Sequence, residues 1–293
     1  PWGGLEVADA HVHFFSRTFF ERLAGQKAGL TVDGIGAQLA WSMPDSAEQL
    51  AAQWVHELDR HSVAKAALMA SVPGDEESVA AAVAGHPDRF FATAMVDPAR
   101  WNPDRLENIR VACLFPAMHR FAIWSEQARR VFEWAAAHGR AVFVHCGMLS
   151  VGVRTKLGLE SRFDMRFSNP IDLHALAMEF AEVPIILPHF GAGYFREALM
   201  LADLCPNVYL DTSSSNGWMR TQESHLDLRQ VFKRALDVVG SKRLLFGTDS
   251  SFFPRGWQAP IFEHQATALY ELGVSHADAR EIFGENLLRI IAG

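Results

Sequence analysis

The sequence predicts an α/β protein, and within that class a (β/α)8 barrel. Short apolar runs alternate with longer stretches of helical periodicity along the whole chain of 293 residues. Eight such runs occur, and they are apolar almost throughout, as in strands that are covered on both faces. Repeated strand–helix units predict a parallel sheet, and eight of them in a chain of this length favour a closed barrel. An open doubly wound sheet is the competing architecture.

The elements follow one another in regular order. The predicted strands are residues 5–9, 63–71, 90–96, 109–115, 140–145, 183–189, 207–212 and 243–248. Helical periodicity covers 46–61, 125–139, 172–182, 194–204 and 223–240. No GxGxxG motif opens a helix after the first strand and no GxxxxGK[ST] motif occurs, so the nucleotide-binding forms of the open sheet have no support.

We expect one barrel domain over residues 1–293, because no Pro/Gly/Ser-rich linker divides the chain. Two segments are too irregular to be simple connections, residues 25–44 and 147–170. Loops of that length in a compact domain usually carry function or form a lid.

Composition excludes several function classes. The net charge is −7 and no block of basic residues occurs, so we expect no nucleic-acid partner. No apolar run approaches the roughly 20 residues of a membrane span, and no secretory signal pattern is visible. Three scattered cysteines do not make a disulfide framework. The sequence therefore predicts a cytoplasmic protein without a membrane partner.

Metal-ligating side chains collect at the carboxyl ends of the predicted strands. They are His11 and His13 after the first strand, His145 after the fifth, His189 after the sixth and Asp249 after the eighth. Because the active site of such a barrel lies at this rim, we expect the five side chains to converge. A single histidine at a strand end is more often a hydrogen-bonded structural residue. Four of them at strand ends favour a metal site.

The spacing of the first pair has a physical reason. Two residues of a strand that are separated by one other residue share a face. His11 and His13 can therefore bind one ion while Val12, between them, packs outward. Imidazole and carboxylate ligands suit zinc and other first-row metals, and a catalytic site keeps a position for water. A divalent ion lowers the pKa of that water toward about 7.

The motifs "DAHVHF", "FVHCG", "LPHFGAG" and "LLFGTDSSF", in this order, resemble the amidohydrolase superfamily, in particular amidohydrolase family 2. The similarity covers essentially the whole chain, and "IFGENLLRII" resembles the helix that closes these barrels. It implies a divalent metal, usually zinc, that is held by His11, His13, His145 and Asp249. His189 would orient or polarise the water or the substrate, and in binuclear relatives it is a ligand of the second ion.

The resemblance also bears on the number of ions. Binuclear members commonly bridge two ions with a carboxylated lysine at the end of strand four. Here that strand reads "RVACLFP", with Cys113 and Phe115 near the rim and no lysine. A thiolate of Cys113 could bind a second ion, but a core position is favoured. We therefore expect one divalent ion, zinc, with manganese as the alternative.

Roles for the site residues follow. Asp249 would act as the general base and then as the proton donor to the leaving group, with a structural cap of the turn "TDSS" as the alternative. His189 would stabilise the developing oxyanion. Substrate-binding candidates are Arg196, Arg255 and His119. A guanidinium binds a carboxylate bidentately, and arginines 154, 166 and 220 lie on the same set of loops.

Three functions compete. The favoured one is a metal-dependent hydrolase that acts on an ester, lactone or amide of a small, carboxylated substrate. The alternative is a non-oxidative decarboxylase or hydratase of an aromatic or unsaturated acid. Many such decarboxylases are longer at the C-terminus, and some replace the first histidine of strand one by glutamate. This sequence is shorter and keeps both histidines, which favours hydrolysis. A non-catalytic binding protein is the third. A homodimer is plausible because such barrels often associate.

Overall fold

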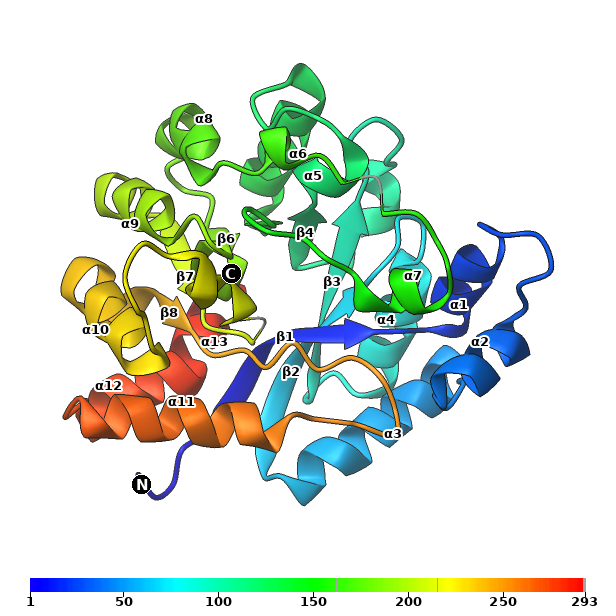
Figure 1. Cartoon of the computed structure of the whole chain (residues 1–293), viewed down its shortest axis with the longest axis horizontal. Helices are drawn as coiled ribbons and strands as arrows, with labels where there is room; N and C mark the ends of the chain where they lie inside the picture. The colour runs from blue at the N-terminus through cyan, green and yellow to red at the C-terminus, as the bar shows by residue number, and fades with distance from the viewer. Residues whose placement is uncertain (162, 215, 292–293) are drawn as a thin grey trace.

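Eight parallel strands form one sheet that is curled into a barrel (Figure 1). The structure is a computed structural model in which residues 1–161, 163–214 and 216–291 are described. The strands are β1 (Val7–Phe14), β2 (Val63–Ala70), β3 (Phe90–Val96), β4 (Val111–Leu114), β5 (Ala141–Val144), β6 (Ile185–Leu187), β7 (Val208–Asp211) and β8 (Leu244–Leu245). Each pairs with its neighbours in chain order, from β1 to β8.

Backbone hydrogen bonds join the first strand to the segment after the last. Ala10 donates to the carbonyl of Phe246 at 2.8 Å, and His13 donates to the carbonyl of Ser250 at 2.7 Å. Asp249 in turn donates to the carbonyl of His11 at 3.0 Å. This closure confirms the predicted (β/α)8 barrel.

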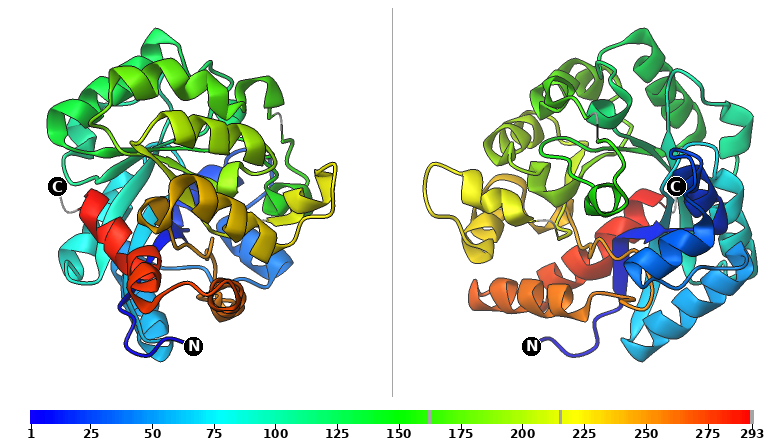
Figure 2. Two further views of the ribbon diagram at one scale, coloured as in Figure 1. Left: turned by 90° about the vertical axis from the view of Figure 1, so that its left-hand side faces the viewer. Right: turned by 45° about the vertical axis from the view of Figure 1, so that its right-hand side comes forward.

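Helices lie outside the strands (Figure 2). They are α1 (Arg17–Ala24), α2 (Val32–Leu39), α3 (Ala47–Arg60), α4 (Glu76–Gly85), α5 (Pro116–His119), α6 (Glu126–His138), α7 (Gly152–Lys156), α8 (His174–Glu179), α9 (Phe195–Leu204), α10 (Leu228–Val239), α11 (Ala259–Glu271), α12 (His276–Arg280) and α13 (Asn286–Ile291). Several begin at a side-chain cap, as the sequence dictates: Ser46 caps α3, Ser125 caps α6, and Asp227 forms a capping box with Gln230 at α10. No helix in the described ranges is both long and apolar enough to cross a membrane.

The eight predicted strands are present, with changed ends. β1 continues to Phe14, because its pairing with β2 extends to Phe14 and Ala70. β8 keeps only two residues, since the chain turns off beyond Leu245 toward β1. The predicted helix 172–182 is shorter and ends at Glu179, because Phe180 leaves the helical conformation at φ −105°, ψ 55°.

Two apolar layers hold the barrel. One lies between the strands and the helices and contains Val12 and Trp54 among many others. The other fills the barrel interior, where Met95 and Phe143 meet Leu287 and Ile290 of α13. The C-terminal helix therefore closes one end of the barrel, and the carboxyl ends of the strands remain for the site.

The two irregular segments contain short helices, α2 within 25–44 and α7 within 147–170. They meet over the rim. Val153 and Leu157 from the α7 region pack against Phe19, Phe20 and Ile35 in a separate apolar cluster. We call residues 148–160 the strap, and Figure 1 shows its helix α7 beside α1.

Candidate metal centre

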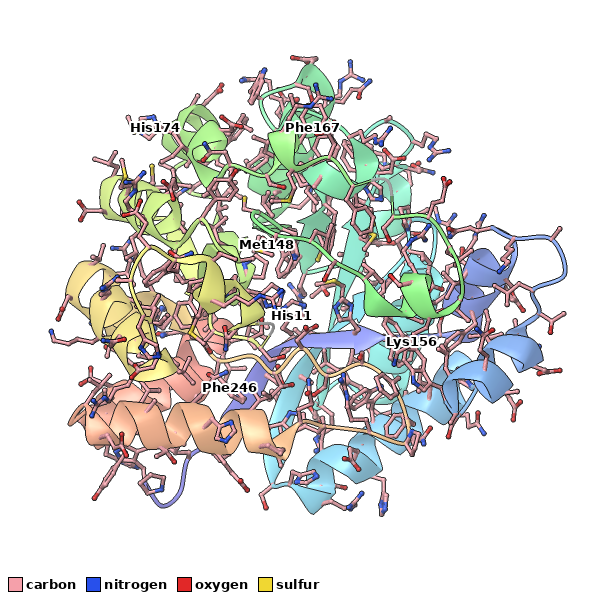
Figure 3. All side chains as sticks on the ribbon, viewed as in Figure 1. His11, Met148, Lys156, Phe167, His174 and Phe246 are labelled. Atoms are coloured by element: carbon pink, nitrogen blue, oxygen red, sulfur yellow. The ribbon has the colours of Figure 1, made fainter. Side chains whose placement is uncertain are left out.

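A bulge in β1 aims the two histidines of this strand into the barrel. The pairing of β1 with β2 shifts between Asp9 and Val12, where three steps along β1 match two along β2. Ala10 therefore packs with the interior cluster, and the ring of the next residue, His11, also lies inward against Phe143, at a centroid distance of 5.2 Å. Figure 3 labels His11 near the middle of the barrel.

His11 is buried and is held by the end of β7. Its Nδ1 lies 2.7 Å from Oδ2 of Asp211 and 3.1 Å from Oγ of Ser213. Because a carboxylate only accepts, Nδ1 carries the proton, and the lone pair of the neutral ring is at Nε2. Nε2 is buried and has no hydrogen-bond partner among the described residues.

His13 and Asp249 complete the inner edge of the site. Nδ1 of His13 lies 2.7 Å from Oγ of Ser71, and its Nε2 lies 3.2 Å from Oδ1 of Asp249. The same oxygen is 3.7 Å from Nε2 of His11. Asp249 has a left-handed backbone, φ 59°, and its carbonyl accepts a hydrogen bond from Gln258. Strain of this kind is typical of functional sites.

His145 and His189 face each other beside this group, with ring centroids 5.4 Å apart. Both rings are buried. Nδ1 of His189 lies 2.9 Å from Oγ of Ser213, whereas Nδ1 of His145 has no partner among the described residues. His189 begins a run of five positive φ angles that ends at Gly193, and the backbone is strained at its three non-glycine residues, His189, Phe190 and Ala192.

Burial and neighbouring charges set the protonation of the site. Burial alone would lower the pKa of His11, but the charge and hydrogen bond of Asp211, helped by Asp249 and Asp9, raise it to about 9. Burial and the neighbouring histidines hold the pKa of His145 well below its ordinary value. Burial would raise the pKa of Asp249, but the histidines around it, His13 foremost, hold it far below its ordinary value.

The donor set fits a divalent ion of the zinc type. One nitrogen each of His11 and His13 and one oxygen of Asp249 lie within 4.8 Å of one another. Two buried nitrogens of this site, Nε2 of His11 and Nδ1 of His145, have no hydrogen-bond partner among the described residues, and such an ion would satisfy them. His145 and His189 stand outside the compact group of three, and the His189 ring lies 5.2 Å from the ring of His11 and 5.4 Å from that of His145.

A buried carboxylate ties the strand ends together behind the candidate ligands. Oδ1 of Asp9 accepts hydrogen bonds from the backbone N–H groups of His11 and Thr248. Oδ2 accepts from the Thr248 hydroxyl at 2.5 Å and from Nε1 of Trp257 at 2.8 Å. Burial nevertheless raises the pKa of Asp9 to about 6. Asp9 thus ties β1, which carries His11, to the segment after β8, which carries Asp249.

The five predicted site residues line one cavity of about 560 Å³. Phe15, Trp41 and Phe252 form an aromatic wall of this cavity, in which Trp41 and Phe252 stack at 3.9 Å. The Arg255 guanidinium lies 4.4 Å over the Phe252 ring and also faces the cavity.

The other two substrate-binding candidates lie elsewhere. Arg196 is exposed on α9 and pairs with its neighbour Glu197, outside the lining of this cavity. His119 ends α5, where Asp97 and Arg100 are the charges that act on it, and it also lies outside the lining. Arg154 and Arg220 do line the cavity.

Three residues that contact the histidines are absent from the predicted set. Asp211 ends β7, so inspection of every strand end for acidic groups could have found it. Ser71 and Ser213 lie just beyond β2 and β7, and serine at such a position carries no distinguishing signal.

Comparison with known proteins identifies relatives of this barrel. A sequence model described as amidohydrolase matches residues 8–290. Among curated proteins, Protein fluG of Emericella nidulans is 36% identical over 102 residues, which are 35% of this chain and 11% of that protein. The chain thus matches about a tenth of the length of this relative.

Solved structures share the fold at low identity. A probable 2-pyrone-4,6-dicarboxylic acid hydrolase from Acinetobacter baumannii, with citric acid bound, has a TM-score of 0.63 and 13% identity, with 99% of this chain and 100% of the other covered. A dihydroxybenzoic acid decarboxylase from Polaromonas sp. JS666, with bound manganese and the inhibitor 2-nitroresorcinol, has a TM-score of 0.64 and 18% identity over 99% and 97%.

Proposed function

Because the chain belongs to the amidohydrolase family, we propose that it is a metal-dependent hydrolase of an ester, lactone or amide in a small, carboxylated substrate. The observation that carries this proposal is the pair of buried, unpartnered imidazole nitrogens, on His11 and His145, beside the Asp249 carboxylate. Buried polar atoms without partners are costly, and a ligand that satisfies them is the simplest reason for their presence.

His11, His13, His145 and Asp249 would hold one ion, which we propose to be zinc, with manganese as the alternative. Their nitrogen and oxygen donors suit either metal. A divalent ion bound there supplies a coordinated water with a pKa near 7 and polarises a substrate carbonyl. Asp211 keeps the proton of His11 on Nδ1, so that Nε2 stays available as a donor atom.

Proton transfer falls to Asp249 and charge stabilisation to His189. Asp249 faces the cavity and is ionised, so it accepts the proton of the attacking water and returns it to the leaving group. Burial lowers the pKa of His189, and its Nδ1 meets the hydroxyl of Ser213, which leaves Nε2 for the developing oxyanion.

Substrate recognition is assigned to Arg255, one of three arginines that line the cavity. Arg255 packs over the Phe252 ring and donates to the Ser251 hydroxyl at 2.7 Å, in the segment that follows Asp249. A guanidinium fixed in this way can bind a substrate carboxylate. Arg196 and His119 do not line the cavity, so only the sequence supports a role for them in substrate binding.

A decarboxylase of an aromatic acid is the second candidate. The stacked rings of Trp41 and Phe252 offer a flat apolar wall to an aromatic substrate. The likeness to a decarboxylase of dihydroxybenzoic acid agrees with it.

Two measurements test the proposal. Metal analysis of the purified protein should give about one zinc or manganese per chain, and a chain that binds neither would contradict it. Incubation with lactones, esters, amides and aromatic acids, followed for acid release and for carbon dioxide, separates the two reactions. A homodimer and a cytoplasmic location stay predictions from the sequence, to be tested by light scattering and by fractionation.

A further inference from the structure

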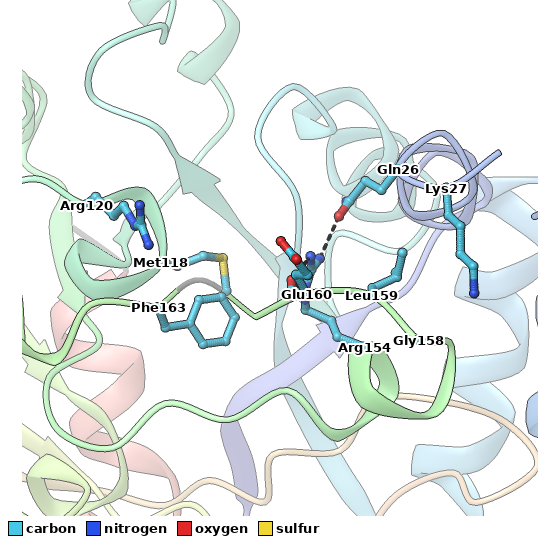
Figure 4. A pocket seen from close by; sticks show the side chains of 9 residues that line it. All are labelled: Gln26, Lys27, Met118, Arg120, Arg154, Gly158, Leu159, Glu160 and Phe163. Atoms are coloured by element: carbon cyan, nitrogen blue, oxygen red, sulfur yellow. Dashed lines mark hydrogen bonds between the residues drawn. The ribbon is translucent and has the colours of Figure 1, made fainter.

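A second cavity of about 680 Å³, lined in part by the strap, adjoins the cavity of the candidate metal centre (Figure 4). Gln26, Met118 and Arg154 line both cavities, so the two compartments share a boundary. We propose that the second compartment binds the distal acidic group of an elongated substrate, a carboxylate or a phosphate. The inference rests on the proposed function, because it places the reacting end of that substrate at the candidate metal centre.

Arg154 stands at the boundary, where neutral acceptors hold its guanidinium. Its Nη1 donates to Oε1 of Gln26 at 2.7 Å, and its Nε donates to the carbonyl of Glu160 at 3.0 Å (Figure 4). Nη2 donates to the same carbonyl. These acceptors are neutral, and Arg154 makes no ion pair with a described residue. Its guanidinium is therefore held in place while two of its five N–H donors stay available to an anion.

Lys27 lines the second cavity and is held in a similar way. Its Nζ donates to the carbonyl of Leu157 at 3.0 Å, and within the described part of the chain no carboxylate pairs with it. Arg120 lines the same cavity from the side of α5, and one acidic residue, Glu160, lines it as well. The charge of Arg120 acts on Asp164, so Arg154 and Lys27 are the two cations that the compartment offers to an anion.

Docking of the strap fixes these cations relative to the site. Gln38 of α2 donates to the carbonyl of Lys156 at 2.7 Å, and Val153 and Leu157 are buried against α1 and α2. The same strap contributes Arg154 to both cavities. A cation on an anchored segment loses less side-chain entropy on binding an anion than one on a free loop.

The ligand that fits is a molecule with two acidic ends. One end reaches Arg255 and the candidate metal centre, an apolar middle lies along the aromatic wall, and the other end passes Gln26 to meet Arg154 and Lys27. Met118 and Phe163 give the second compartment apolar walls beside its cations.

The test compares zinc-loaded protein with α,ω-dicarboxylates of four to nine carbons and with monocarboxylates of equal length, by isothermal titration calorimetry. At the length that spans both cavities, we expect the dicarboxylate to bind about tenfold more tightly than the monocarboxylate of equal length. Arg154→Gln and, separately, Lys27→Gln should remove most of this preference while monocarboxylate affinity is kept. Arg166→Gln is the matched control, because Arg166 lies on the same irregular segment, is exposed and pairs with Asp164.

Each outcome decides a stated point. Absence of a dicarboxylate preference at every length, with zinc and monocarboxylates bound, overturns the compartment and leaves the proposed function intact. An equal loss in Arg166→Gln also overturns it, since general charge would then explain the effect. A preference that needs Arg154 in protein that fails to bind zinc supports the compartment and contradicts the proposed function. Thermal unfolding shows whether each variant is folded. If Arg154→Gln does not fold, Lys27→Gln alone provides the test.

Discussion

The carboxylate of Asp211 lies 2.7 Å from Nδ1 of His11, and both side chains are buried at the end of the barrel. This contact fixes the ring and its tautomer and leaves Nε2 directed at the cavity that His13 and Asp249 also line. Asp211 is therefore part of the site although it does not line the cavity itself.

The first prediction concerns this contact. Asp211→Asn should lower the affinity for zinc about 10- to 100-fold, because the neutral amide oxygen is a weaker acceptor for the Nδ1–H group of His11 than the carboxylate. Competition with a chromophoric chelator measures the affinity. Asp237→Asn is the control, since Asp237 is an exposed partner of Lys233. Unchanged affinity in Asp211→Asn would remove His11 from the proposed ligand set.

The second prediction is a pH dependence of metal binding. In the metal-free protein the pKa of His11 is about 9, so at pH 7 its ring carries the proton that an ion must displace. Binding should release this proton below pH 9, and the logarithm of the affinity should rise with pH until about 9, by about one per pH unit from this group. Calorimetry in two buffers of different ionisation enthalpy counts the protons. If the same number of protons is released on metal binding at pH 7 and at pH 10, the raised pKa of His11 does not govern binding.

The order of the predicted strands and helices was enough to predict the barrel. It also predicted that the five site residues converge, because strand ends share one rim in a parallel barrel. The bulge at Ala10 and His11 could not be predicted, since it depends on how β1 pairs with β2. Strict alternation from Ala8 would have turned His11 away from the interior. The placement of Arg196 likewise depends on a partner, Glu197, and on the direction of α9, neither of which a motif encodes.

The third prediction concerns the close approach of the loops after β5 and β6. Gly147 has φ 79°, and a Cβ there would lie 2.2 Å from the carbonyl oxygen of Gly191. Gly147→Ala should therefore destabilise the chain by about 3 kcal/mol or more and separate His145 from His189. Gly152→Ala is the matched control, because nothing lies within 4 Å of its added Cβ. Urea unfolding measures both, and equal stabilities would show that the two loops move apart at little cost.

The last prediction uses the buried carboxylate behind the site. Trp257→Phe removes the indole donor 2.8 Å from Oδ2 of Asp9 and should lower the free energy of unfolding by about 1–3 kcal/mol. Part of the loss must depend on pH. The hydrogen bond favours the ionised carboxylate, so its removal costs more above the pKa of Asp9, about 6, than below it.

Unfolding of the metal-free protein in urea at pH 5 and at pH 7.5 should therefore show a larger difference between wild type and Trp257→Phe at the higher pH. The volume lost from the core is the same at both values and cancels in this comparison. Trp124→Phe, at an exposed position, should change neither value. The change in this stability loss between pH 5 and pH 7.5 distinguishes two protonation states of Asp9. A carboxylate that is ionised at pH 7.5 and held by four donors predicts the increase, whereas one that stays protonated across this range predicts the same loss at both pH values.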